Sequence, residues 1–299
     1  MKVIIACLAC LGLVSMVYVH AAATDIDALW IRGQPQASEA RMRSALAEAT
    51  DDDARLMITS QIARTYVFRK QFERAREALA AVEPLLAQAG AEAQAHYWLE
   101  LGRTYASHQH ARTDVDQTTR DAAREAFDRA LATARVANLQ SLAIDALHMQ
   151  AFVDPGAAQQ IVWNERALKA ALAADQANAT RWEASIRNNL GENLVELARY
   201  REALPHFRRA LLLRQRAKAP PAIIRDAGWQ VGRVLRLNGE LREALAVQIE
   251  LADESLAAGT PKPYIYRELA LLYAALGDQD RAAHFSEHRQ ALVAAQVSH

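Results

Sequence analysis

The amino-acid sequence predicts an all-α protein in which helical hairpins stack into a solenoid. Its composition favours helices, because the 299 residues are rich in alanine and include only 11 glycines and 8 prolines. Small residues recur about every 40 positions, from Ala63 to Gly102 and again from Gly191 to Gly232 and Ala270. A period of this size indicates a repeat architecture. No linker rich in glycine, serine or proline divides the chain, so we expect one continuous array.

Charge and cysteine content exclude several classes of function. The 35 basic residues balance 35 acidic ones, so the chain lacks the positive field on which nucleic-acid binders depend. Both cysteines, Cys7 and Cys10, lie within the first 23 residues. If those residues are removed, no disulfide, thiolate metal site or cysteine nucleophile remains.

Residues 1–23 have the pattern of a secretory signal peptide. Lys2 precedes an uncharged stretch at 3–19, and a small-residue motif ends at Ala23. This pattern predicts cleavage after Ala23 and a periplasmic or secreted chain that starts at Thr24. The stretch 3–19 is also nearly long enough to span a membrane, so a membrane-anchored protein is the alternative.

Helix boundaries follow from the apolar pattern and from turn residues. Residues 24–50 are expected to form an N-terminal extension with a short helix over 38–49, for which Ser38 is the N-cap candidate. The polar segment 107–119 is expected to be a loop, and Asp154-Pro155-Gly156 the turn of the third hairpin. Six hairpins are predicted within a repeat domain at 51–295, over residues 52–88, 91–137, 139–175, 178–217, 221–258 and 262–295.

The repeated residues resemble the signature of the tetratricopeptide repeat family. In one copy the matching residues are Trp98, Leu101, Gly102 and Tyr105. A second copy matches at Leu190, Gly191, Leu194, Tyr200, Ala203, Phe207 and Ala210. The spacing exceeds the roughly 34 residues of the standard repeat and is similar to the longer variety in kinesin light chains and bacterial peptide sensors. The resemblance covers residues 51–295 and implies a right-handed superhelix with a concave and a convex face.

The resemblance also implies where a partner would bind. In that family the first helix of each pair lines the concave surface, and the residues beside the small position point into it. Transferred residue by residue, the expected groove consists of Asn188, Asn189, Glu192, Trp229, Arg233, Arg236, Arg267, Arg64 and Arg103. Such side chains suit peptide groups, carboxylates and a rigid aromatic contact. The alternative is that they solvate one helix face and pair with neighbouring acidic residues.

Two strings of metal-ligand residues have a simpler explanation. The string HFSEH at 284–288 matches that of inverted zinc proteases, but only 11 residues follow it to supply a third ligand. The cluster of His108, His110, Asp114 and Asp116 offers ligands for a divalent ion, yet a solvated loop explains it better. Phosphate-binding loops, dinucleotide motifs and nucleophile elbows do not occur in the sequence.

The sequence therefore predicts an exported scaffold that is not an enzyme and that holds a peptide segment or protein partner in its groove. No catalytic residue, metal, cofactor or nucleic acid is expected. One alternative is a zinc-dependent hydrolase that uses His284, Glu287 and His288. Another is a structural adaptor of the cell envelope, and membrane contact is expected only if residues 3–19 are retained.

Overall fold

Every regular element in the described part of the chain is helical. The computed structural model describes residues 25–111 and 115–297, so the predicted signal peptide lies outside it. The α-helices are α1 (Pro35–Glu48), α2 (Asp52–Phe68), α3 (Phe72–Ala80), α4 (Ala91–Tyr105), α5 (Gln117–Val136), α6 (Gln140–Val153), α7 (Ala157–Ala173), α8 (Ala177–Thr180), α9 (Trp182–Glu196), α10 (Tyr200–Arg216), α11 (Pro221–Leu237), α12 (Leu241–Ala257), α13 (Pro263–Ala275) and α14 (Gln279–Val297). Two short 3₁₀ helices, η1 (Asp27–Leu29) and η2 (Glu83–Ala87), accompany them. None of the described helices is long and apolar enough to cross a membrane.

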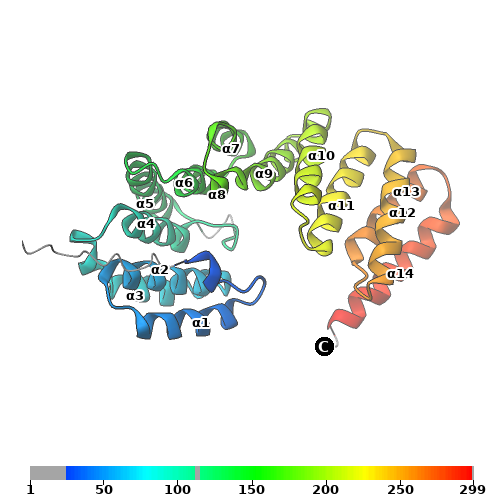
Figure 1. The fold of residues 1–299 in the computed structure, drawn as a ribbon. Helices are drawn as coiled ribbons and strands as arrows, with labels where there is room; N and C mark the ends of the chain where they lie inside the picture. Colours follow the sequence, from blue (N-terminus) through cyan, green and yellow to red (C-terminus); the bar gives the residue numbers. More distant parts are fainter. Residues whose placement is uncertain (1–24, 112–114, 298–299) are drawn as a thin grey trace, which may run out of the picture.

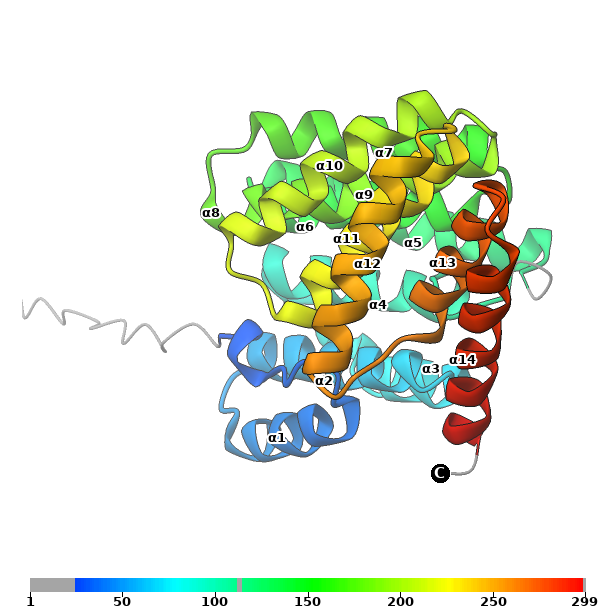
Figure 2. The same ribbon diagram turned by 90° about the vertical axis from the view of Figure 1, so that its right-hand side faces the viewer.

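The helices pack as six consecutive pairs, as the sequence predicts. The pairs are α2 with α3, α4 with α5, α6 with α7, α9 with α10, α11 with α12, and α13 with α14. They follow an arch, with α1 to α3 at one end and α13 and α14 at the other (Figure 1). A view from the C-terminal side shows α12 and α14 nearest the viewer (Figure 2). The protein is an all-α solenoid.

A close contact at the small residue holds several pairs together. A Cβ atom added to Gly102 would lie 2.4 Å from the ring of Phe127, and one added to Gly191 would lie 2.6 Å from the ring of Phe207. Both rings are fully buried. Since only glycine leaves room for the ring, the glycine and the aromatic residue together set the distance between the two helices.

Short turns with left-handed residues end many of the helices. Lys70, Ala198, Gly239 and Gly277 have φ angles of 58°, 56°, 83° and 86°, and each lies between the two helices of one pair. After α9, the amide of Arg199 donates to the Leu194 carbonyl at 2.8 Å. That bond satisfies a carbonyl that the helix end leaves free and reverses the chain within a few residues.

The start of α1 differs from the prediction. Helix α1 begins at Pro35 after Gln34, so Ser38 is not the N-cap but a buried residue of the first turn. Proline is favoured at the first helical position because its fixed φ suits the helix and its missing N–H would be unpaired there anyway. The Ser38 hydroxyl accepts from the Ile31 amide at 2.9 Å and thereby ties the preceding segment to α1.

Both predicted connections are present, but the loop predicted over 107–119 is shorter, because α5 already begins at Gln117. The loop after α4 ends where α5 begins at Gln117, with the carboxylate of Asp116 accepting from the Thr119 amide at 2.7 Å as the N-cap. Asp154-Pro155-Gly156 joins α6 to α7. The Asp116 cap favours the start of α5, and Pro155 prevents α6 from continuing.

We expect Gly191→Leu to destabilise the protein by about 1–3 kcal/mol, because the larger side chain would force α9 away from Phe207. Urea unfolding followed by circular dichroism measures the change. Ser185→Leu, on the exposed side of α9, is the matched control and should change stability little. An unchanged free energy of unfolding for Gly191→Leu would mean that the glycine contact is not a packing constraint.

Candidate functional site

Two of the predicted groove residues, Asn188 and Trp229, line one cavity of about 390 Å³. We call it the α9–α11–α13 site. The residues that line it come from α9, the end of α10, α11 and the start of α13, and they are Asn188, Arg214, Ile223, Asp226, Trp229, Gln230, Lys262 and Tyr264. A cavity of this size, with aromatic walls and a few converging polar groups, has the properties of a ligand site.

Trp229 forms the aromatic wall of the site. Its ring centroid lies 4.8 Å from that of Tyr264, and the guanidinium carbon of Arg233 lies 5.6 Å from it. The indole Nε1 is buried and has no hydrogen-bond partner among the described residues. Leaving a buried donor unpaired costs roughly 1–3 kcal/mol, so the protein would gain if the indole turned and brought this N–H to an acceptor on a bound molecule.

On the inner surface, the side where successive first helices meet, Arg233 flanks Trp229, and Arg214 near the end of the second helix α10 lines the same cavity. Arg233 pairs with Glu192 at 3.1 Å and donates to the Gln230 side chain at 3.2 Å, while Gln230 also donates to Glu192. Arg214 donates to the Asn188 side-chain oxygen at 3.3 Å. Burial lowers the pKa of Arg214, and the nearby Asp226 carboxylate partly offsets this effect. Arg233 is therefore paired with a carboxylate, whereas Arg214 hydrogen-bonds to a neutral amide and has the Asp226 carboxylate nearby.

The far wall of the site comes from the start of α13. The Tyr264 hydroxyl donates to the Asp226 carboxylate, and burial together with that carboxylate raises the pKa of Tyr264. Lys262 occupies the N-cap position of α13, and no acidic side chain in the described chain pairs with it. The site therefore contains two cations, Arg214 and Lys262, and one carboxylate, Asp226, so its net charge is positive.

Three other predicted residues lie outside this cavity. Arg236 forms two hydrogen bonds to Glu268, at 2.6 and 3.2 Å, and this pair links α11 to α13. The amide of Asn189 faces His148 at 3.4 Å. Arg267 is exposed and lines a separate depression between α13 and α14.

The remaining two predicted residues belong to a cluster of charges on α2, α4 and α6. Arg103 is only 5% exposed, and its guanidinium contacts both Glu100 and Asp145 at 2.5 Å. Arg64 lies 3.7 Å from Glu100. The expectation of an accessible Arg103 is therefore wrong, since two carboxylates already saturate it inside the protein, and Arg64 shares one of them.

Burial shapes the protonation of this cluster. Burial raises the pKa of Glu100 against the opposing effect of Arg103, and one Glu100 oxygen has no partner among the described residues. Asp145 has a lowered pKa because the charges of Arg103 and Arg64 outweigh its burial. Burial lowers the pKa of His96 to about 4. A neutral His96 agrees with its contact, since the Gln61 amide nitrogen approaches its Nδ1 at 3.2 Å.

The two metal-ligand strings do not form metal sites in the described chain, where no group of three or more candidate ligands converges. In α14 the rings of His284 and His288 lie 6.4 Å apart, and His288 stacks on Tyr266 at 4.4 Å. In the loop after α4, His110 stacks on Phe72 at 3.9 Å. Asp114 lies outside the described residues.

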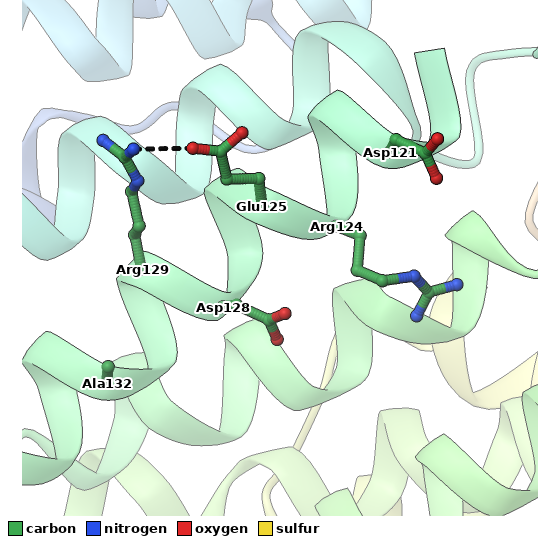
Figure 3. A pocket seen from close by; sticks show the side chains of 6 residues that line it. All are labelled: Asp121, Arg124, Glu125, Asp128, Arg129 and Ala132. Carbon is green, nitrogen blue, oxygen red and sulfur yellow. Dashed lines mark hydrogen bonds and ion pairs between the residues drawn. The ribbon is translucent and has the colours of Figure 1, made fainter. Parts of the chain in front are cut away.

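A shallow depression on α5 has the character of a solvated helix face. All six residues that line it come from α5, and Figure 3 shows Glu125 and Arg129 paired along the helix. Arg124 leans away toward Asp154, with which it pairs at 2.7 Å. These charges satisfy one another, so the depression offers little to a ligand.

Sequence reasoning missed Arg214, Asp226, Gln230, Lys262 and Tyr264. Part of the signal was present, because Asp226, Trp229, Gln230 and Arg233 follow the spacing of one helix face on α11. Nothing in the sequence pattern singles out Lys262 or Tyr264, because only the packing of α13 beside α11 brings them to Trp229.

Solved structures share this architecture. No family model matches the sequence, and no curated protein matches it. The chain is similar to a STAND-type signal transduction ATPase with a tetratricopeptide repeat sensor, PH0952 from Pyrococcus horikoshii, with a TM-score of 0.65 and 16% identity over 87% of this chain. It is similar to the apo form of RapI with a TM-score of 0.64 and 13% identity, over 88% of this chain and 71% of that one.

The chain has the fold of a tetratricopeptide-repeat solenoid. The apo form of NprR, a quorum sensor from B. thuringiensis, is also similar, with a TM-score of 0.50 and 13% identity over 90% of this chain and 83% of that one. This chain spans 39% of the length of PH0952.

We expect His96 to make stability depend on pH. An unfolded histidine titrates near 6.5, whereas folded His96 titrates near 4, so the unfolded chain binds a proton first as the pH falls. The contribution of His96 is therefore fully present above about pH 6.5 and is lost progressively down to about pH 4. Glu100, with its raised pKa, acts in the opposite direction.

Urea unfolding between pH 7 and pH 4 isolates the histidine when it is compared with His96→Asn, which keeps an acceptor near Gln61 but does not titrate. The variant should lose less stability than the natural protein over this range. Equal slopes for the two proteins would show that His96 is not held neutral by the fold.

Proposed function

We propose that this protein binds a peptide or protein segment at the α9–α11–α13 site, without catalysis, in the periplasm or outside the cell. The unpartnered Trp229 indole N–H is the observation that carries the proposal. This buried donor is costly in the free protein, and a turn of the indole that brings it to an acceptor on the bound segment would recover that cost.

The chemistry of the site favours an acidic segment with an apolar side chain beside the acid. Lys262 and Arg214 attract a carboxylate, and Trp229, once its indole turns toward the cavity, can donate to the same group or to a peptide carbonyl. Ile223 and the rings of Trp229 and Tyr264 provide apolar surface. A volume of about 390 Å³ suits part of a chain, so the rest of the segment would extend along the inner surface.

Similar structures support a binding role. PH0952 carries a tetratricopeptide repeat sensor, and NprR is a quorum sensor. Both share the fold of this chain at identities of 16% and 13%. Repeat solenoids use their extended surfaces for binding, which agrees with the position of the site between repeats.

Substitutions at Trp229 should lower the affinity for a peptide without lowering the stability of the fold. We expect Trp229→Phe, which keeps a ring but removes the N–H, to weaken binding about 3- to 10-fold, as the loss of one hydrogen bond would. Trp229→Ala should weaken it about 30-fold, or about 2 kcal/mol. A library of acidic peptides, screened by fluorescence anisotropy, supplies the probe, and thermal melting of each variant supplies the control. If Trp229→Ala melts much earlier while its folded fraction binds normally, Trp229 belongs to the core and the site is misplaced.

Charge reversal tests the acidic preference. We expect Lys262→Glu to abolish binding of the acidic peptides that bind the natural protein, because the site would then carry a net negative charge. Lys169→Glu makes the same change on the exposed side of α7 and should leave binding unchanged. Equal loss in both variants would point to a general effect of net charge.

N-terminal sequencing tests the proposed export. The protein recovered from the periplasm or medium should begin at Thr24. Recovery of a membrane-bound form that still contains residues 3–19 would favour the anchored adaptor instead.

A further inference from the structure

The segment before α1 bridges two distant repeats. Asp27 in η1 forms an ion pair with Arg181, at the start of α9, with an N–O distance of 2.8 Å across 154 positions of sequence. Ile26 is buried against the helices around α2. Residues 25–31 therefore run from the first repeat to the fourth.

Trp30 is the anchor of this segment on α2. Its indole N–H donates to the Gln61 side chain at 3.0 Å, its ring meets the edge of Phe68 with 5.7 Å between centroids, and the Arg64 guanidinium lies 5.5 Å from the ring. Gln61, Arg64 and Phe68 occupy one face of α2 by their spacing. A donor satisfied by a side chain and a ring covered by a cation are the contacts with which proteins recognise an aromatic residue of a partner.

The surface beneath Trp30 is partly apolar and partly polar. Trp30 packs against the apolar cluster around α2, and its indole N–H meets the Gln61 side chain. The Gln61 side-chain nitrogen lies 3.2 Å from His96 Nδ1 and donates to Glu100 at 3.5 Å, and the second oxygen of Glu100 is buried without a partner in the described chain. The segment therefore covers a group of polar side chains as well as apolar surface.

The segment is held by bonds to α1 as well as by Trp30. The Ile31 amide donates to the Ser38 hydroxyl at 2.9 Å, and the Arg41 guanidinium donates to the Ala28 carbonyl at 3.1 Å. The Asp27 and Arg181 side chains are 72% and 65% exposed, and exposed ion pairs contribute about 0–1 kcal/mol. Gly33 has a φ of 71°, which other residues adopt only with strain, and it joins the segment to α1. Release of the segment by rotation near Gly33 would break the bonds to Ser38 and Arg41 while α1 stays packed on α2.

We propose that residues 25–31 are an exchangeable intramolecular ligand of the inner surface. Residues 25–31 cover the N-terminal half of the inner surface. A partner segment that has a tryptophan three positions after an aspartate binds to the same surface in place of residues 25–31. This second site shares no residue with the α9–α11–α13 site, so either can fail in experiment while the other stands.

A peptide with the sequence of residues 25–34, labelled for fluorescence anisotropy, tests the exchange. We expect it to bind the Trp30→Ala protein at least tenfold more tightly than the natural protein, whose own Trp30 competes. The same peptide with alanine in place of its tryptophan should not bind, and Gln61→Leu added to Trp30→Ala should weaken binding. Equal affinity for the natural and Trp30→Ala proteins, or no binding by a folded Trp30→Ala protein, would overturn the proposal.

Hydrogen exchange gives a second measurement. It uses the natural protein, so it does not depend on whether a variant folds. Opening of the segment alone should let the Trp30 indole N–H exchange at least tenfold faster than the backbone amides in the middle of α2. Exchange of this indole only at the rate of those amides would show that the segment opens with the whole protein, and the proposal would then be wrong.

Discussion

The contact between a glycine on one helix and a bulky side chain on the next is the constraint on which the rest of this solenoid depends. Gly102 meets Phe127 and Gly191 meets Phe207, both at distances that no Cβ atom could share. In the fifth pair the bulky partner of Gly232 is Gln248, whose amide donates to the Trp229 carbonyl. These contacts fix how closely the two helices of a pair approach. They therefore also determine which side chains of the first helix can contact the first helix of the next repeat.

On the inner surface, arginines mostly connect one repeat to the next. Arg64 reaches Glu100, Arg103 reaches Asp145, and Arg236 reaches Glu268, in each case from one first helix to the following one. Arg233 makes the same kind of bridge backwards, to Glu192. Of these bridges, only the Arg103–Asp145 pair is buried, and removing one partner of a buried pair typically costs about 3–5 kcal/mol; the more exposed bridges contribute less.

The two halves of the inner surface consequently differ. In the N-terminal half, carboxylates saturate the arginines, and Trp30 of the chain itself covers what remains. In the C-terminal half, the Trp229 indole N–H has no partner, and Lys262 forms no ion pair in the described chain.

The sequence by itself determined the helical hairpins, their order and nearly all of their boundaries. Those features depend on local signals, namely small residues at a fixed period, capping residues such as Asp116, and prolines that stop helices. It also placed Asn188 and Trp229 beside each other, because the repeat fixes their positions on adjacent first helices. Ser38 misled the prediction because Pro35 gives an equally good start for α1 three residues earlier.

Only the tertiary structure decided which polar side chains are free to bind. Arg103 and Arg233 have the same position in their repeats, yet one is buried between two carboxylates and the other flanks an open cavity. The difference comes from the acids on neighbouring helices, 40 or so positions away in the chain. Lys262, Tyr264 and Trp30 likewise acquire their roles through packing between repeats, and no local pattern encodes a contact between residues so far apart.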